Sequence, residues 1–417
     1  MMEAEVVELI TEVKKVPMLR FPDFKAEWKK NQLGSFTKIY DGTHQTPIYT
    51  ETGIPFYSVE QITANDFENC KKISEEVYER ECKRVKLEKG DILMTRVGDV
   101  GTSKYFDWDV KASFYVNVAV IKKSEAANNR FIDQYIKSSF FQKELYKRTI
   151  HVAFPKKINL GEIGKCSVNL PSLLEQDKIA SFLTSVDDKT QQLAKKKDLL
   201  EKYMKGVMQQ IFSQQIRFKD ENRQDFPEWE EKKLGQVFER VKTKNAKNNK
   251  NVLTISAQQG LVNQEDYFNK SVSAENVTGY YLLHKGDFAY NKSYSKGYPM
   301  GAIKRLTKYD KGVVSTLYIC FKIKDGSSEA YYEQYFNSGY LNSELQKIAQ
   351  EGARNHGLLN MSVVEFFNDI ELPRPSESEQ LKIAAFLSAI DNKIELVTTK
   401  LEQAKLFKKA LLQQMFV

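Results

Sequence analysis

Cysteine and histidine are scarce in this chain. The 417 residues contain four of each. Cys70, Cys82, Cys166 and Cys320 are scattered and form no CxxC pair. The spacing that is typical of zinc sites and of small disulfide-rich secreted domains is therefore absent. We expect reduced structural cysteines and no metal bound by this chain.

Long apolar runs are also absent. The longest apolar-rich pieces, residues 115–121 and 313–321, have the length of strands, whereas a bilayer span needs roughly 20 residues. The N-terminal stretch EAEVVELI is acidic where a signal peptide would be basic. The sequence thus predicts no membrane association and a cytoplasmic location. Its net charge of +8 suits a polyanionic partner, although many solubilising surfaces are equally basic.

Motifs for catalysis are missing as well. The segment Gly161–Lys165 has two glycines and a lysine, but it lacks the four-residue gap and the following Ser or Thr of a phosphate-binding loop. Asp23, Glu27 and Lys29 lie too close in sequence to come from separate strands of a nuclease metal site. No Asn-Pro-Pro-Tyr segment of an adenine methyltransferase occurs. We predict no catalytic residues, and a protein that positions something for others.

What the sequence does contain is a long internal repeat. Residues 175–212 return 204 positions later as residues 379–416, with 14 of 38 positions identical, where composition alone would give about two. The preceding stretches also match, since Glu27-Trp28 reappears as Glu228-Trp229 and Lys89-Gly90-Asp91 as Lys285-Gly286-Asp287. The chain is therefore a duplicated pair, each half a globule followed by a helix, with an internal pseudo-two-fold.

Both repeated segments have a seven-residue apolar period. The recurring residues are Ile179, Val186, Leu193, Leu200 and Val207 in the first segment, and Ile383, Ile390, Val397, Ala404 and Leu411 in the second. Tyr203 and Phe407 are expected to fill part of the same seam. A sustained heptad over about 57 Å of helix is typical of a coiled coil. We predict that the two helices pack antiparallel on each other; the alternative is that each only covers its own globule.

The fold class that follows is α+β, with two duplicated α/β domains separated by two long helices. Short strands rich in β-branched and aromatic residues are expected at residues 116–121 and 317–323, with glycines marking the turns. The predicted boundaries are an N-terminal helical segment at 1–17, a first globule at 18–170, a central spacer helix at 171–216, a second globule at 217–372, and a C-terminal spacer helix at 373–417.

Three motifs stand in one order along nearly the whole chain. They are a Trp-containing opening followed by Leu-Gly, the turn KGDILMTR at Lys89–Arg96, and the helix pattern Glu-Gln-x-Lys-Ile-Ala-x-Phe-Leu…Asp-x-Lys within residues 170–189 and 372–393. Together they resemble the DNA specificity subunit of type I restriction-modification systems. The second globule departs from the pattern in the turn, where residues 287–292 read DFAYNK.

The resemblance implies a function. Each globule would be a target recognition domain that reads one half of a bipartite site in double-stranded DNA, and the helices would set the gap between the halves. Two methyltransferase subunits would dock alongside, and two restriction/translocase subunits would join them. S-adenosylmethionine, ATP and Mg are then expected on those partners, and no cofactor on this chain.

Base reading needs amide, guanidinium or ammonium groups, and phosphate contacts need Lys, Arg or small polar donors. Candidates in predicted turns and loops are Thr43, His44, Arg96, Lys104, Lys156 and Lys157 in the first globule, and Gln258, Gln259, Lys292, Tyr294, Lys296, Arg354, Asn355 and His356 in the second. For each, the alternative is an ordinary solvated or fold-supporting side chain, and Tyr294 can equally belong to the core. Two other functions stay open: a coiled-coil scaffold without a DNA role, and a nuclease or methyltransferase that acts alone.

Overall fold

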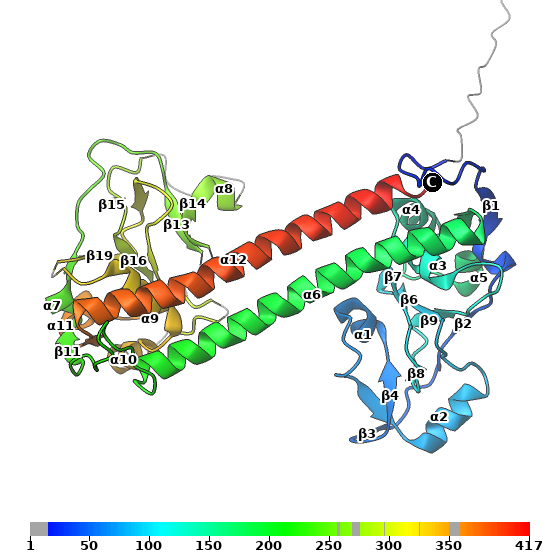
Figure 1. Ribbon diagram of the computed structural model, residues 1–417, viewed down its shortest axis with the longest axis horizontal. Coiled ribbons are helices and arrows are strands. Elements are labelled where there is room, and N and C mark those ends of the chain that lie inside the picture. Colours follow the sequence, from blue (N-terminus) through cyan, green and yellow to red (C-terminus); the bar gives the residue numbers. More distant parts are fainter. Residues whose placement is uncertain (1–15, 257–258, 269–275, 296, 325, 350–358) are drawn as a thin grey trace, which may run out of the picture. The chain divides into compact units, whose positions relative to one another are not determined.

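The computed structural model describes residues 16–256, 259–268, 276–295, 297–324, 326–349 and 359–417 (Figure 1). The predicted N-terminal helical segment lies almost wholly outside these residues. The chain forms two compact units: one comprises the residues up to Ala194 together with Thr399–Val417, and the other comprises Lys195–Thr398. Each unit thus contains one globule and one half of each long helix. No helix among the described residues has both the length and the apolarity that a membrane span requires.

The first globule is built on a four-stranded antiparallel sheet in the order β2-β9-β6-β7. A smaller sheet, β3-β5-β4-β8, and the pair β1-β10 complete it. The elements are β1 (Lys29–Gln32), β2 (Ile39–Asp41), β3 (Tyr49–Thr50), β4 (Ile54–Tyr57), α1 (Val59–Ala64), β5 (Lys71–Ile73), α2 (Glu75–Cys82), β6 (Ile92–Val97), β7 (Asp99–Tyr105), β8 (Ser113–Phe114), β9 (Val118–Ile121), α3 (Asn129–Ile136), α4 (Ser139–Arg148), α5 (Leu160–Gly164) and β10 (Ser167–Leu170), with a short 3-10 turn at Leu33–Ser35.

The second globule repeats the main sheet as β12-β19-β16-β17 and the small pair as β11-β20. Its outer part differs, because the hairpin β13-β14 and the separate antiparallel pair β15-β18 stand where the first globule has its second sheet. The elements are β11 (Glu230–Lys233), α7 (Leu234–Val237), β12 (Phe238–Arg240), β13 (Leu253–Ser256), β14 (Gly260–Asn263), α8 (Gln264–Phe268), β15 (Tyr281–His284), β16 (Phe288–Asn291), β17 (Ala302–Arg305), β18 (Lys311–Val314), β19 (Ile319–Ile323), α9 (Glu329–Ser338), α10 (Asn342–Ile348), α11 (Val363–Asn368) and β20 (Glu371–Arg374).

The repeated Lys-Gly-Asp motif is a turn that leads into the central strand of each main sheet. Gly90 and Gly286 have φ of 96° and 100°, a region that residues with a Cβ rarely adopt. The buried Asp91 carboxylate accepts from the main-chain N–H of Glu88 at 2.8 Å and from Lys122 Nζ at 2.6 Å. Asp287 accepts from the main-chain N–H of His284 at 2.8 Å. The motif is therefore fold-determining in both copies.

The two long helices are α6 (Leu173–Phe212) and α12 (Glu377–Gln414). In the first unit, Leu183 of α6 shares a buried cluster with Leu411 of α12 and with Met415, which directly follows that helix. In the second unit, Val207 of α6 shares a buried cluster with Ile383 and Leu387 of α12. The start of one helix thus meets the end of the other in each unit, which confirms the antiparallel coiled coil. Figure 1 draws α6 and α12 as two long helices.

The burial of the helices follows the heptad. Of the predicted seam residues, Ile179, Val207, Ile383, Ile390, Val397 and Leu411 are buried, and Val186, Leu193, Leu200 and Ala404 are half-buried. Tyr203 and Phe407 were expected beside them, but they are 53% and 54% exposed. The seam continues through the next residue of each helix, buried Met204 and half-buried Lys408. Alternating steps of three and four residues place these two positions inward, and the aromatic residue before each points away.

One buried carboxylate attaches each globule to its helix. Glu175, in the first turn of α6, accepts from Arg20 Nε at 2.7 Å and from Trp28 Nε1 at 3.3 Å. Glu379 of α12 repeats the arrangement, since it accepts from Arg217 Nη2 and Trp229 Nε1, both at 2.9 Å. Arg20 and Arg217 come from the segments that lead into the globules. The first residue of the repeated helix motif is therefore a structural anchor.

The following glutamine makes a second attachment. Gln176 Oε1 accepts from the main-chain N–H of Asn128, at the start of α3, at 2.9 Å. Gln380 Oε1 accepts in the same way from Ser328, at the start of α9, at 2.8 Å. Further along the helix, Gln134 and Gln334 donate to Asp187 and Asp391 at 2.8 and 2.7 Å. The motif that identifies the repeat thus holds a globule on a helix.

We expect Glu379→Gln to lower the free energy of unfolding by roughly 3–5 kcal/mol, because it removes the buried charge partner of the Arg217 guanidinium and leaves it only the exposed Glu228, at 3.5 Å. Urea denaturation followed by circular dichroism would measure the change. The control is Glu201→Gln, since Glu201 is exposed and pairs with Lys197 at 3.1 Å; such surface pairs contribute about 0–1 kcal/mol. Equal stability of the two variants would contradict the anchoring role.

Candidate nucleic-acid interface

Arg96, at the end of β6, joins three loops of the first globule. Its Nε donates to the Ile158 carbonyl at 3.1 Å, and its Nη1 donates to the Val116 carbonyl at 2.8 Å. Nη1 also lies 3.4 Å from the Asp41 carboxylate. Burial lowers the pKa of Arg96, while the Asp41 charge acts in the opposite direction. The side chain is only 11% exposed, so in this structure it organises loops and does not project to a partner.

Asp41, at the end of β2, is the acidic centre of this cluster. Its carboxylate is buried and accepts a hydrogen bond from Arg84 Nη2 as well as facing Arg96. His44 Nε2 lies 3.2 Å from the same carboxylate, with the imidazole 63% exposed. Arg84 Nη1 also donates to the Gly42 carbonyl at 2.9 Å. The carboxylate therefore holds the loop after β2 in one conformation and fixes His44 at its surface.

The remaining candidate residues of the first globule lie in two separate regions. Thr43 is buried, and its hydroxyl donates to the Gln45 carbonyl at 3.1 Å. Lys156 and Lys157 are exposed on the loop after α4. The Lys156 carbonyl accepts from the main-chain N–H of Gly98 at 2.8 Å, which joins this loop to the β6–β7 hairpin. The contacts of Arg96 thus bring five of the candidates into one region, namely Thr43, His44, Arg96 itself, Lys156 and Lys157.

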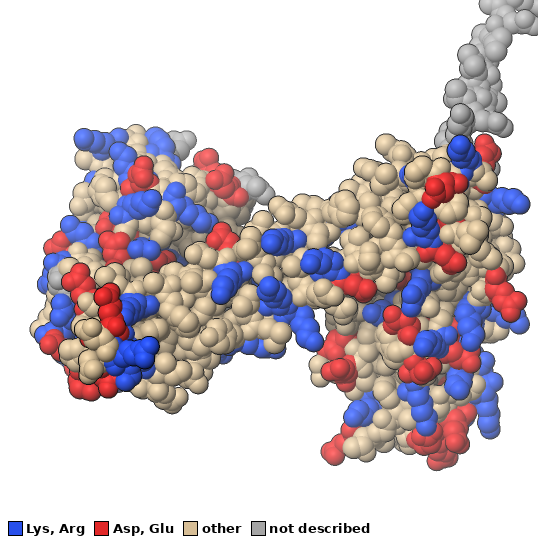
Figure 2. All heavy atoms as spheres, viewed as in Figure 1, with Lys and Arg blue, Asp and Glu red and all other residues tan. Residues whose placement is uncertain are grey.

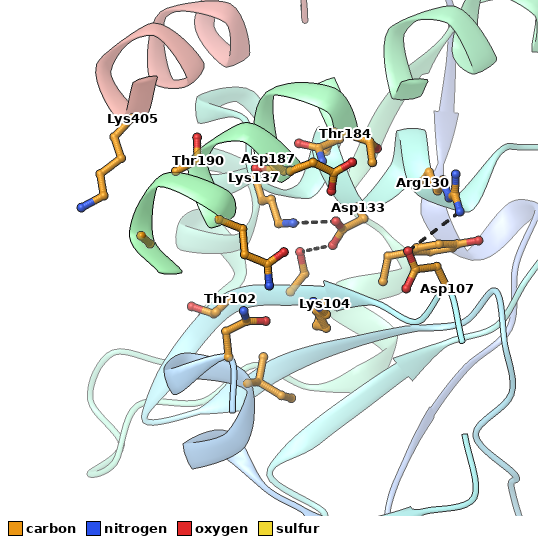
Figure 3. A pocket seen from close by; sticks show the side chains of 18 of the residues that line it. Thr102, Lys104, Asp107, Arg130, Asp133, Lys137, Thr184, Asp187, Thr190 and Lys405 are labelled. Atoms are coloured by element: carbon orange, nitrogen blue, oxygen red, sulfur yellow. Dashed lines mark hydrogen bonds and ion pairs between the residues drawn. The ribbon is translucent and has the colours of Figure 1, made fainter. Parts of the chain in front are cut away.

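Lys104 lies elsewhere, in a polar pocket of about 680 Å³ between β7, α3 and the helix pair of the first unit (Figure 3). Its ammonium lies 5.4 Å from the ring centroid of Trp108 and 5.8 Å from that of Phe67. Burial lowers the pKa of Lys104, and the neighbouring Lys137 lowers it further. Cation–π contacts offset part of the lost hydration.

The charges that line this pocket are largely matched with one another. Asp133 accepts from Ser103 Oγ at 2.7 Å and from Lys137 Nζ at 2.5 Å. Asp187 accepts from Gln134 and is ion-paired with Lys408 of α12. Within the part of the chain that the structure describes, no group of three or more His, Cys, Asp or Glu residues is placed to hold a metal ion. The ion pairs of the pocket therefore lie within the globule or between the two helices, and the hydrogen bond from Gln134 to Asp187 joins the globule to α6.

In the second globule, Lys292 occupies the place of Arg96 at the end of the central strand. The main-chain N–H of Leu359 donates to the Lys292 carbonyl at 3.1 Å, as that of Ile158 donates to Arg96 at 3.0 Å. Tyr294 is 58% exposed, so it is not a core residue. Gln259 lies in the β13–β14 turn, where its main-chain N–H donates to Ser256 Oγ at 3.2 Å. Gln258, Lys296, Arg354, Asn355 and His356 lie outside the described residues.

Charge alone does not mark an interface on the face shown in Figure 2. There, Lys and Arg side chains are interspersed with Asp and Glu on both globules. A protein that binds a DNA site in two separate halves does not need a single basic patch on one subunit, because phosphate contacts can be shared with partner subunits. The arrangement can position hydrogen-bonding loops against a duplex.

Sequence reasoning missed the residues that hold the site together. Asp41 and Arg84 received no role, although Asp41 directly precedes the Gly-Thr-His turn that was singled out. Glu175 and Glu379 were visible as identical positions of the repeat, and that identity was the available signal. For Arg84, nothing in the local sequence distinguishes it from its charged neighbours in residues 79–86.

Comparison with known proteins adds the family. Residues 25–202 and 227–406 each match the type I restriction modification DNA specificity domain. A protein of Methanocaldococcus jannaschii, provisionally assigned as the type I restriction enzyme MjaX specificity subunit, is 23% identical over 411 residues, covering 93% of this chain and 92% of its own length.

Solved structures show the same fold. The crystal structure of a type I restriction-modification S subunit from M. genitalium has a TM-score of 0.61 at 13% identity, covering 96% of this chain and 99% of that one. A chain from a study of complex assembly and conformational transition in a type I system has a TM-score of 0.51 at 13% identity, covering 94% and 99%. The two copies of the domain follow one another along the chain and account for most of its sequence. This chain therefore belongs to the type I restriction-modification DNA specificity family.

Proposed function

We propose that this chain is the non-catalytic DNA-reading subunit of a type I restriction-modification complex, and that each globule reads one half of a bipartite site. The observation that carries the proposal is the pattern of similarity between the halves. The anchors Glu175 and Glu379 have matching partners, and the main sheets match, whereas the outer strands differ. Two globules with different outer strands on one duplicated scaffold can recognise two unrelated half-sites, whereas a symmetric dimer would require a palindromic site.

The chemistry then belongs to partner subunits. We propose that two methyltransferase subunits dock on the helices and that two restriction/translocase subunits join them. S-adenosylmethionine, ATP and Mg would be bound by those subunits. The helices would set the gap between half-sites and direct adenine methylation. A coiled-coil scaffold without a DNA role is not favoured, because the loops joined by Arg96 have no place in such a function.

Co-expression of the chain with its methyltransferase partner, followed by genome-wide mapping of methylated adenines, tests the proposal. One bipartite sequence with a constant gap is the expected result. Methylation at a continuous sequence, or methylation by the partner alone at the same sites, would contradict it.

Tyr203 and Phe407 are the strongest candidates for partner contact. They are equivalent positions of the repeat, and each exposes about half of its aromatic side chain, 53% and 54%. Exposed aromatic residues often dominate the binding energy of protein interfaces. Their equivalence suits two copies of one partner, one on each unit.

We expect Tyr203→Ser and Phe407→Ser each to weaken the binding of one methyltransferase copy by about thirtyfold, the equivalent of roughly 2 kcal/mol. The double variant should lose both copies. Mass photometry of the purified complex counts the bound copies, and Gln192→Ser, at an exposed position of α6, is the matched control. Retention of both copies by the double variant would place the docking surface elsewhere.

A further inference from the structure

The loop between α4 and α5 is closed at its base and joined to the main sheet. The main-chain N–H of Ile150 donates to the Lys157 carbonyl at 2.7 Å, and the reverse bond measures 3.4 Å. Gly98, at the tip of the β6–β7 hairpin, donates to the Lys156 carbonyl at 2.8 Å. Residues 151–156 therefore project from a base fixed at both ends. We refer to residues 150–157 as the apolar loop.

The tip of the apolar loop presents apolar side chains to solvent. Phe154 and Val152 are 104% and 96% exposed, the two highest values among the large apolar residues that the structure describes. A single exposed apolar residue is ordinary in a soluble protein. Here two such residues, separated only by Ala153, lie on a short projection whose base is held by the bonds at Lys157 and Gly98.

The charge within the loop itself is of one sign, and the nearest acidic residue of the adjoining hairpin, Asp99, follows Gly98 and accepts from Thr95 Oγ1 at 3.0 Å. Lys156 and Lys157 are exposed, and no Asp or Glu occurs between Thr149 and Gly161. His151 packs on Tyr146 with ring centroids 4.3 Å apart, and its Nε2 lies 2.8 Å from the Tyr146 carbonyl oxygen. Two apolar side chains beside two ammonium groups suit a surface that is itself apolar between two lines of negative charge. In a DNA duplex the base edges in the grooves are polar, but the faces of adjacent base pairs are apolar and lie between the two phosphate backbones, so an inserted apolar side chain would meet such a surface.

We propose that Phe154 inserts between two adjacent base pairs of the half-site read by residues 18–170, an inference that rests on the proposed DNA-reading function. Val152 then lies against the same base step, and Lys156 and Lys157 contact the flanking phosphates. Apolar wedges of this kind partly unstack a base step and kink the duplex by about 20–90°. The first globule then recognises the deformability of the DNA as well as the hydrogen-bonding groups of its bases. Flexible pyrimidine–purine steps are therefore favoured at the insertion point.

The second globule provides an internal contrast. Its corresponding segment, residues 350–358, reads QEGARNHGL and contains no Phe, Tyr or Trp. Insertion is therefore expected in one half-site only.

The test uses the full chain in complex with its methyltransferase partner, and duplexes carrying 2-aminopurine at successive positions of both half-sites. Unstacking raises the fluorescence of this base. We expect an increase at one step of the first half-site, separate from the adenines that the methyltransferase extrudes, and none at a corresponding step of the second half-site. Phe154→Ala should abolish that increase and weaken binding about tenfold, whereas Phe154→Leu should keep most of both. Phe140→Ala, at a partly exposed position on α4, should change neither.

Each other outcome has a distinct meaning. If the wild-type complex methylates the bipartite site but Phe154→Ala changes neither fluorescence nor affinity, the wedge is overturned and the DNA-reading function stands. If Phe154→Ala instead releases the methyltransferase, the apolar loop is a protein-docking surface and the wedge is overturned. Failure of the wild-type complex to bind any split site would overturn both proposals.

Discussion

Replacing residues 18–170 with the equivalent domain of a relative is expected to change one half of the methylated DNA sequence completely and to leave the other half and the gap unchanged. The physical reason is that the core of this globule, around Trp28 and Phe131, is shared with the parts of the two long helices and the C-terminal residues that belong to the first unit. The second globule has separate cores of its own. Base contacts made by one globule should therefore be independent of the other.

The exchange must preserve the contacts between the replaced segment and the helices, and the Glu175 anchor is the main one. Arg20 and Trp28 lie within the replaced segment, but their partner Glu175 lies outside it. A donor domain must supply both side chains, and an otherwise identical chimaera with methionine at the arginine position is the control for lost anchoring. Methylation mapping reads the outcome. A change in both half-sites, in a complex of normal stability, would contradict independent reading.

The plan of the fold could be predicted from the sequence because it depends on features that repeat along the chain. The duplication and the heptad are local patterns, and burial at Ile179, Val207, Ile383 and Leu411 follows the period. The limit of this reasoning appears at Tyr203 and Phe407. An apolar residue one position away from a seam is compatible with either burial or exposure, and the sequence period alone does not separate them.

The candidate site could be predicted only in part. Arg96 has the chemistry of a base reader, but its acceptors on Asp41 and Ile158 lie 55 and 62 residues away in sequence. Whether a guanidinium projects or is held depends on those distant contacts, and no local pattern records them. The apolar loop is the opposite case, in which distant contacts expose a residue instead of burying it. Phe154 would be assigned to a core by composition, and its exposure follows from the hydrogen bonds at Lys157 and Gly98.

The second large effect concerns helix length. Inserting seven residues after Leu193 of α6 and seven after Thr398 of α12 is expected to widen the gap in the methylated site by up to about three base pairs. Seven residues preserve the heptad phase and add about 10 Å of helix, against about 3.4 Å for each base pair. Genome-wide methylation mapping measures the gap directly.

The matched insertion is needed because both helices belong to both units. If only α6 is lengthened, α12 is too short to keep Phe416 in the core of the first globule, where it packs against Trp28 and Phe131, and Ile383 in the core of the second. We therefore expect the single insertion to lose activity. A matched insertion of two residues would turn each seam by about 200° and expose it, so that variant should also fail. An unchanged gap in a folded, active complex with both seven-residue insertions would mean that the helices only anchor partners and that the spacing is set by other subunits.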